Sequence, residues 1–255
     1  MNRWLQRCYA GSVYLFLYLP LLIVAVFSCN SSKYSLAWKG VTFDWYVKLW
    51  QNTGLMTTAL HSLIIAACAA TLATLLGTGA AFILHHYRFA GRRMLFGMLF
   101  VMMMSPDIVI AISLLLLFLA LYLPLGFSTL LIAHTVLCVP FVATTVFSRF
   151  HGFPTDIVDA ARDLGANEYQ VFRQIILPLA APAVAGGWLL SFTLSLDDVI
   201  ISFFTTGPNY EVLPLRIYSM VRLGIKPDVN ALCVVMMAIT VTALVLSRKL
   251  LKEKT

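Results

Sequence analysis

Residues 94–148 read MLFGMLFVMMMSPDIVIAISLLLLFLALYLPLGFSTLLIAHTVLCVPFVATTVFS, and Asp107 is the only charged residue among them. About 20 consecutive apolar residues are enough for one helix to cross the hydrocarbon core of a bilayer. The stretch is more than twice that length, and Pro124-Leu125-Gly126 marks a turn near its middle. This part of the chain therefore predicts two membrane-spanning helices in succession.

The composition of the whole chain is also that of a membrane protein. Hydrophobic residues make up 60% of the 255 residues and charged residues 11%, whereas soluble domains average about 45–50% apolar and about 25% charged. A soluble fold of this size could not hide so much apolar surface, and a disordered chain needs the opposite composition. The net charge of +7 comes from basic residues spread between the apolar runs. It therefore indicates membrane topology, and we expect no nucleic-acid partner.

Six apolar segments are long enough to span a bilayer, and we expect an all-α membrane protein with six transmembrane helices. The predicted spans are 9–29, 57–84, 94–122, 127–147, from after Pro178 to about 204, and 230–247. We expect residues 1–255 to form a single transmembrane domain. Its core, helices two to six, would cover about 56–247, with a cytoplasmic loop at about 149–178 between helices four and five.

An even number of spans puts both termini on one side of the membrane. With the N-terminus in the cytoplasm, twelve of the 18 Lys and Arg residues lie in cytoplasmic segments, as the positive-inside rule requires. We therefore expect an N-in/C-in orientation. The apolar stretch after Arg3 and Arg7 is longer than that of a signal peptide, and no A-x-A site follows it. This favours an uncleaved anchor.

Other residue types give weaker signals. The five cysteines show no C-x-x-C spacing, so they indicate neither a disulfide framework nor a zinc site, and we expect no metal. His61 and His134 each lie alone in an apolar segment, where we expect a histidine that hydrogen-bonds to a neighbouring helix. Small residues crowd the second span and predict close helix packing, namely Ala66, Ala67, Ala69, Ala70, Gly77, Gly79, Ala80 and Ala81.

Three carboxylates fall within the apolar segments: Asp107, Asp197 and Asp198. A charge at the centre of a transmembrane helix costs about 2.5–3.5 kcal/mol on insertion scales, and intramembrane acids are functional by default. No lysine or arginine lies at a similar depth, and a cavity with excess acid attracts cations. We expect these acids to face an aqueous path or a partner. The alternative is a hydrated acid, near the interface or a helix end, that is merely tolerated.

Span five carries a polar face. Its members are spaced by three or four residues, which places them on one side of a continuous helix: Trp188, Ser191, Ser195, Asp198 and Ser202. Asp197 points about 100° away from that face, so we rank it below Asp198. We predict no catalytic residue. We predict a substrate path lined by Asp107, Asp198, Asp197, Trp188, Ser191 and Ser195.

Asp107 follows Ser105-Pro106. Proline removes a backbone donor and bends a helix, and such breaks are tolerated where helices line a cavity. We therefore expect a kink in span three that opens room beside this acid. A kink required only for packing, with Asp107 near a helix end, is the alternative.

The loop between spans four and five is the most informative polar stretch. Pro154 marks a helix start, and Gly165 suits the left-handed position after a helix end. Asn167 and Gln170 have the spacing of a capping box, which predicts a second helix that ends at Pro178. We expect two short amphipathic helices that turn at a glycine on the cytoplasmic face, a unit that can fill a groove in a partner.

The loop contains the pattern Asp159-Ala160-Ala161-x3-Gly165-x9-Ile175-x-Leu177-Pro178. It resembles the EAA loop, E-A-A-x3-G-x9-I-x-L-P, in permease subunits of binding-protein-dependent ABC importers. Asp159 stands where glutamate is usual, which keeps the charge and shortens the side chain by one methylene. The resemblance implies that four residues belong to a coupling helix seated in a cleft of the ATP-binding subunit: Asp159, Ala160, Ala161 and Gly165.

Three further segments resemble the permease subunits of spermidine/putrescine importers: MMSPDIV at 103–109, LSFTLSLDDV at 190–199 and LPLRIYSMV at 213–221. This resemblance covers nearly the whole chain. It implies a second homologous permease subunit, two ATP-binding subunits and a periplasmic polyamine-binding protein, assembled at a bacterial inner membrane. It also implies that ATP and Mg²⁺ bind to the partner ATPase subunits and that this chain carries no cofactor.

The chain contains no G-x-x-x-x-G-K-[ST] phosphate-binding motif, so we do not expect it to be an enzyme that hydrolyses ATP. We expect a permease subunit that moves polyamines into the cytoplasm, because unpaired carboxylates suit a cargo with several ammonium groups. Two alternatives remain open. One is the same scaffold carrying another cationic or small solute, and the other is an ion-coupled secondary carrier. A cation channel is disfavoured because no filter signal is present.

Overall fold

The structure, a computed structural model, describes residues 3–32, 37–150, 160–222 and 227–252. Within these ranges the chain is helical, and the only extended pairings are two isolated bridges, Asn30 with Val41 and Gly207 with Tyr210. The predicted all-α class is therefore confirmed. Contacts divide the chain into two units, Met1–Thr57 with Arg216–Thr255, and Thr58–Leu215.

The first unit is built mainly from α1 (Arg3–Phe27), α2 (Asp44–Gln51) and α12 (Pro227–Lys252). α12 packs against α2 and α1. The apolar window of α1 has no residue buried inside the described chain. A helix that is apolar all round needs lipid or another protein around it, which fits the predicted membrane anchor.

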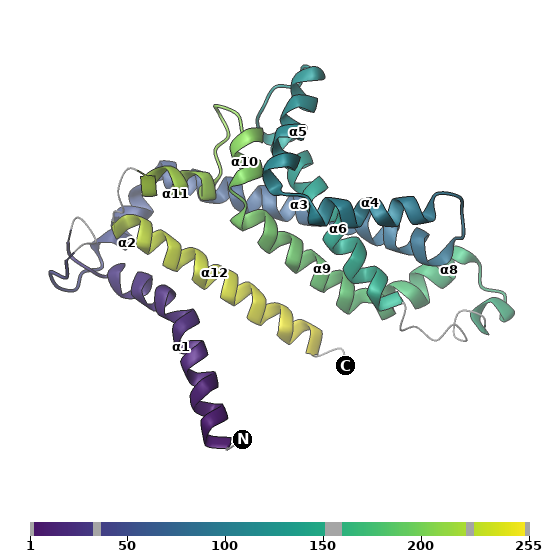
Figure 1. The fold of residues 1–255 in the computed structure, drawn as a ribbon, viewed down its shortest axis with the longest axis horizontal. Coiled ribbons are helices and arrows are strands. Elements are labelled where there is room, and N and C mark those ends of the chain that lie inside the picture. The colour runs from purple at the N-terminus through teal and green to yellow at the C-terminus, as the bar shows by residue number, and fades with distance from the viewer. Residues whose placement is uncertain (1–2, 33–36, 151–159, 223–226, 253–255) are drawn as a thin grey trace. The chain divides into compact units, whose positions relative to one another are not determined.

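The second unit has α6 at its centre (Figure 1). α6 packs against α9, α4, α10 and α5, and half of its most apolar window is buried. This unit contains α3 (Thr53–His86) from Thr58 onward and the start of α11 (Leu213–Arg222). Between them it includes α4 (Arg92–Met104), α5 (Asp107–Ala120), α6 (Phe127–Phe150), α8 (Glu168–Val171), α9 (Leu177–Asp197) and α10 (Ile200–Thr205).

The predicted spans differ in how far single helices cover them. α4 and α5 reach the length of a span only as a bent pair, whereas α12 runs from Pro227 to Lys252 and so covers the sixth predicted span, 230–247. Helices do occupy the first, second and fourth predicted spans. Among the described residues, four helices are long and apolar enough to cross a membrane, or five with the bent pair: Gln6–Phe27, Thr53–His86, Phe127–Phe150 and Glu168–Asp197.

The third predicted span, 94–122, is not one kinked helix. α4 and α5 are separate helices bent by 110° at the break (Figure 1). Ser105 has ψ 137° and Pro106 has ψ 136°, so two successive residues are extended. The ring of Pro106 disfavours the α conformation at Ser105, and the Ser105 hydroxyl donates to the Val101 carbonyl at 2.7 Å. Proline thus ends α4 completely, and Asp107 opens a new helix.

The fifth predicted span, which the sequence extends to about 204, is also interrupted. α9 ends at Asp197, Asp198 has an extended ψ of 126°, and α10 begins at Ile200. Aspartate competes with helical hydrogen bonding because its carboxylate bonds to nearby backbone N–H groups. The helical spacing alone did not reveal this break.

The second loop helix does not end at Pro178. α8, the π-helical segment η1 (Phe172–Ile176) and α9 follow one another without interruption, and the Leu177 N–H bonds to the Phe172 carbonyl. The prediction of a stop is wrong because the wide turn ends just before the proline. Pro178 therefore lies in the first turn of α9, where a missing N–H is tolerated.

Small residues bring α3 and α9 close to α6, as predicted. Ala66, Ala69 and Ala81 of α3 are fully buried. A Cβ added at Gly77 would lie 2.7 Å from the Cβ of Val142 on α6, and one at Gly187 of α9 would lie 3.2 Å from Val142 Cγ1. Val142 is thus enclosed by two glycines, which fixes how closely the three helices approach.

We predict that Gly77→Ala destabilises the protein by about 1–3 kcal/mol, the usual cost of overpacking a core. The melting temperature of the purified chain in detergent measures it. Gly79→Ala is the matched control on the same helix, because nothing lies within 4 Å of its added Cβ. It should keep or raise the melting temperature, since alanine favours helix. Equal effects of the two variants would contradict close packing at Gly77.

Candidate functional site

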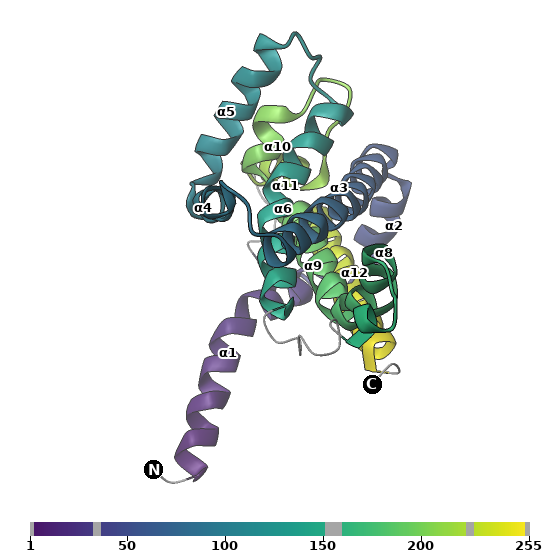
Figure 2. The ribbon, with the colours of Figure 1, turned by 90° about the vertical axis from the view of Figure 1, so that its right-hand side faces the viewer.

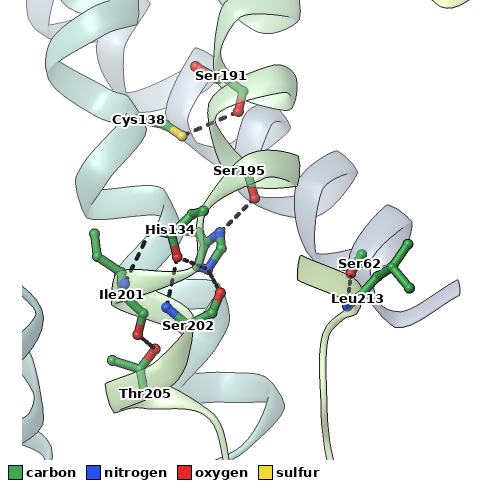
Figure 3. A network of polar contacts seen from close by, with 10 residues as sticks. Ser62, His134, Cys138, Ser191, Ser195, Ile201, Ser202, Thr205 and Leu213 are labelled. Atoms are coloured by element: carbon green, nitrogen blue, oxygen red, sulfur yellow. Dashed lines mark hydrogen bonds and ion pairs between the residues drawn. The ribbon is translucent and has the colours of Figure 1, made fainter. Parts of the chain in front are cut away.

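A polar network lies at the break between α9 and α10, with His134 of α6 at its centre (Figure 3). The Nδ1 of His134 lies 2.7 Å from the Oγ of Ser195 on α9. Its Nε2 lies 3.0 Å from the Oγ of Ser202 on α10 and 3.6 Å from Oδ2 of Asp198. His134 is only 1% exposed. The expectation of a histidine that hydrogen-bonds to neighbouring helices is confirmed here.

Asp198 organises the start of α10. Its Oδ1 accepts the N–H of Ile201 at 3.2 Å and its Oδ2 accepts the N–H of Ser202 at 2.7 Å. These bonds satisfy two backbone donors that a helix start otherwise leaves open. The side chain is 7% exposed, so Asp198 is a buried cap in contact with His134 in this conformation.

The predicted polar face of span five is divided by the break. Ser191 and Ser195 are buried against α6, where the Sγ of Cys138 donates to the Ser191 carbonyl at 3.5 Å (Figure 3). The Ser191 hydroxyl is buried and has no hydrogen-bond partner among the described residues. The half-buried Trp188 donates its indole N–H to Thr71 Oγ1 of α3 at 3.1 Å.

Asp107 and Asp197 are both exposed on the second unit. Asp107 is the first residue of α5 and Asp197 the last residue of α9. α5 packs against α10, and both views of the fold show these helices adjacent (Figures 1 and 2). Ile201, just after the α9–α10 break, shares a buried cluster with Ala111, which lies one turn after Asp107. The structure thus gathers all three predicted acids near the two helix breaks.

A helical elbow precedes α8. Residues 160–163 are helical, and Gly165 follows with a φ of +83°. The Ala166 N–H bonds to the Ala161 carbonyl and the Gly165 N–H to the Arg162 carbonyl, which is the hydrogen-bond pattern of a Schellman motif. The left-handed glycine predicted at position 165 is therefore confirmed.

The structure also places two other residues of the predicted coupling helix. Ala161 packs against the buried core of the second unit, and Ala160 is exposed. Asp159 lies outside the described residues.

The predicted capping box is confirmed at the start of α8. The Asn167 side chain accepts the Gln170 N–H, and the Gln170 side chain accepts the Asn167 N–H, both at 2.9 Å. Hydrogen bonds therefore fix the direction of the chain both before Gly165, through the Schellman motif, and after it, through the capping box.

An ionic cluster ties the elbow to the end of α3. Arg162 Nε lies 3.0 Å from Glu168 Oε1, and Glu168 Oε2 lies 3.0 Å from His86 Nε2. Arg162 also lies 3.2 Å from the His86 ring nitrogen. Phe82 stacks on His86 and packs edge-on against Phe172.

Glu168 begins a helical run of 30 residues that ends at Asp197. About 20 residues suffice to span the hydrocarbon, so we place this exposed carboxylate outside it. The hydrogen bonds from Arg162 lower the pKa of the Glu168 carboxyl, and the charge of Arg162 and the His86 ring act in the same direction. The carboxylate therefore stays ionised at neutral pH, in the form that holds both partners.

Several members of these sites carry no clear signal in the sequence. His134 lies alone in an apolar helix, and its partners are 61 and 68 residues away. Arg162, Glu168 and His86 have the residue types of an ionic cluster, but only the fold brings α3 to the elbow. In the described part of the chain, no group of three or more His, Cys, Asp or Glu residues is arranged to hold a metal.

A family model described as "Binding-protein-dependent transport system inner membrane component" matches residues 73–253. The chain belongs to this family. It is a multi-pass permease component of an inner-membrane transport system, and the resemblance of its loop to the EAA pattern is explained by this membership.

Curated relatives match the chain over most or all of its length. It is 49% identical over 255 residues to the spermidine/putrescine transport system permease protein PotC of Escherichia coli K12, covering 100% of this chain and 97% of that protein. PotC of Haemophilus influenzae is 48% identical over 254 residues, with 99% of each chain covered. The putrescine transport system permease protein PotI of E. coli K12 is 42% identical over 224 residues, covering 85% of this chain and 80% of that protein.

Solved structures share the fold at low sequence identity. A bacterial ABC transporter that imports the acidic polysaccharide alginate matches with a TM-score of 0.74 and 13% identity, over 96% of each chain. The inward-facing MetNI methionine ABC transporter matches with a TM-score of 0.69 and 16% identity, over 79% of this chain and 96% of that one. At these identities the comparison supports the fold alone.

We predict that Asp198→Ala destabilises the chain by about 0.5–2 kcal/mol, the cost of losing a helix cap. Asp197→Ala, at the neighbouring exposed acid, should leave the stability within about 0.5 kcal/mol of wild type. Thermal unfolding in detergent compares the two variants directly. A larger loss from Asp197→Ala than from Asp198→Ala would contradict the capping role.

Proposed function

We propose that this chain is one permease subunit of an ATP-driven importer that moves polyamines of the spermidine/putrescine type into the cytoplasm. The family assigns the kind of transport, and relatives with 48–49% identity are named for this cargo. The structural observation that carries the cargo assignment is the exposed pair of acids, Asp107 and Asp197, at two adjoining helix breaks. Within the described ranges neither forms an ion pair with a lysine or arginine.

Unpaired carboxylates in an apolar bundle lower the electrostatic barrier for a polycation. Two acids on different helices can each meet one ammonium group of a linear amine. They should bind it weakly, because a path that holds its cargo tightly does not conduct. Trp188, a half-buried residue of α9, offers its indole ring for a cation–π contact with a passing ammonium group.

Ser191, Ser195 and Asp198 form a layer behind the exposed acids. They are buried between α9, α10 and α6 in the described conformation. Cargo would reach them only when α9 moves relative to α6. We therefore propose that they line the path in another stage of the transport cycle, with Asp107 and Asp197 as the acids that cargo meets in this one.

The proposed assembly has six spans in this chain, oriented N-in/C-in, beside a second homologous permease subunit. Two ATP-binding subunits would hold ATP and Mg²⁺, so this chain would need no cofactor and no catalytic residue of its own. A periplasmic polyamine-binding protein would deliver the cargo. The named systems of the relatives and the family description support this general organisation.

The proposed route of coupling follows one helical path. The elbow that contains Ala160, Ala161 and Gly165, with Asp159 before it, would seat in a cleft of an ATP-binding subunit. From Glu168 the helix runs for 30 residues to Asp197, a length of about 45 Å at 1.5 Å per residue. A movement of the elbow would therefore reach the acid-bearing break directly and bias an inward-facing or outward-facing state.

Two alternatives are separated by experiment. The same importer could carry another cationic or small solute, which uptake competition in reconstituted vesicles would reveal. An ion-coupled carrier working alone would need a proton gradient and no ATP. The complete transporter in proteoliposomes tests both: polyamine uptake should require ATP and persist without a gradient. Gradient-driven uptake by this chain without ATPase subunits would refute the proposal.

We predict that Asp107→Asn raises the apparent KM for polyamine uptake by about tenfold. The variant loses one close contact between opposite charges, and a tenfold change corresponds to about 1.4 kcal/mol of binding free energy. Asp107→Glu is the matched control, since it keeps the carboxylate, and it should stay within about threefold of wild type. Uptake of labelled polyamine into proteoliposomes provides the measurement. An unchanged KM in Asp107→Asn, at normal transporter content, would remove this residue from the path.

We predict that Gly165→Val uncouples ATP hydrolysis from uptake or blocks assembly. Among the described residues, no atom lies within 4 Å of an added Cβ at this position, so the expected effect comes from the left-handed backbone conformation. A β-branched residue resists this conformation at a cost of about 1–2 kcal/mol. Gly165→Asn should retain coupling because asparagine tolerates it. The ratio of ATP hydrolysed to polyamine imported reports the result, and equal ratios in both variants would contradict a rigid elbow.

A further inference from the structure

His134 connects the two sides of the α9–α10 break from a third helix. Ser195 lies two residues before the end of α9, and Ser202 is the third residue of α10. Each hydroxyl bonds to a different nitrogen of the same ring (Figure 3). The ring thus fixes the last turn of α9 relative to the first turn of α10.

The surroundings of His134 explain why a histidine is needed for this contact. Ser195 is 4% exposed and Ser202 is 0% exposed, so neither hydroxyl can turn to water if the ring is lost. Buried polar groups need partners. An apolar residue at 134 would fill the space and leave both hydroxyls, and one face of the Asp198 carboxylate, without this neighbour.

The same contact decides which acid faces outward. Asp198 turns inward to cap α10 beside the ring, and the preceding residue, Asp197, is exposed. α10 in turn packs on α5, where Ile201 shares a buried cluster with Ala111 and Leu114. Because Asp107 is the first residue of α5, a fixed α10 also fixes where this second acid stands.

We infer that His134 is a positioning residue that sets the separation of the carboxylates of Asp107 and Asp197, and thereby the preference of the permease for cargo with a given spacing between its ammonium groups. This inference rests on the proposed polyamine transport. In the described conformation His134 is buried behind the break, so it acts on the exposed acids through Ser195, Ser202 and Asp198.

The test compares linear α,ω-diamines of different chain length, with spermidine, as cargo for the complete transporter in proteoliposomes. His134→Leu should change the ratio of apparent KM values between short and long amines by about two- to tenfold, the range that loss of one net hydrogen bond covers. The binding protein is the same in every assay, so a changed ratio belongs to the permease. A residue required only for folding would lower the transporter content without changing this ratio.

Two conservative variants identify which contact matters and keep the test decisive if His134→Leu fails to assemble. Glutamine places an amide near the Nε2 position, facing Ser202 and Asp198, whereas asparagine reaches only the Nδ1 position, facing Ser195. His134→Gln should restore the wild-type ratio more fully than His134→Asn. His61→Gln is the matched control, since His61 is half-buried and contacts the Glu211 carbonyl on another segment, and its ratio should equal that of wild type.

A double-mutant cycle completes the test. If His134 acts through the position of Asp197, then adding His134→Leu or His134→Asn to Asp197→Asn should produce no further change in the ratio. Independent, additive effects would overturn the inference, as would wild-type ratios in all His134 variants at normal transporter content. A wild-type transporter that moves no polyamine at all would overturn the proposed function and this inference with it.

Discussion

A helix that stops inside an apolar layer leaves backbone N–H and C=O groups without partners, and water is not available there to replace them. Among the described residues of the second unit, two helix breaks fall within the apolar stretches of the sequence, and nearby side chains bond to backbone groups at each of them. Asp198 accepts two N–H groups of α10, and the Ser105 hydroxyl bonds back to a carbonyl of α4. The acids of this protein therefore stand where the backbone is interrupted. Their positions follow from the need to end helices as much as from any need to attract a cation.

The two acids at the α9–α10 break have different surroundings although they are neighbours in sequence. Asp198 is engaged by backbone N–H groups and lies beside His134, whereas Asp197 is exposed. A carboxylate that is already a cap is poorly available to a passing ammonium group, whereas an exposed one has no competing partner. This difference supports our proposal that Asp197 meets the cargo while Asp198 positions α10, whereas the helical spacing in the sequence favours Asp198 as the acid of the path.

The features of this arrangement that depend on residues close together in the sequence can be predicted from it, and those that depend on residues far apart cannot. Local rules worked: the left-handed Gly165, the capping box of Asn167 and Gln170, the all-helical class and the close packing of small residues in α3 each depend on a few neighbouring residues. The extents of spans three and five, and the stop at Pro178, were wrong, because apolar periodicity does not register an aspartate that prefers capping or a wide turn that accommodates proline. The clusters around His134 and Arg162 join residues from different helices, so no spacing in the sequence contains them.

The π-helical segment Phe172–Ile176 has a consequence for the geometry of the elbow. It holds one more residue than an α-helical turn would, inside an otherwise continuous helix between the glycine elbow and the acidic break. Each residue of an α-helix turns the chain by about 100°. The extra residue therefore sets the rotational position of the elbow relative to the acid-bearing end of α9, and this position differs by roughly that angle from the one in an uninterrupted α-helix.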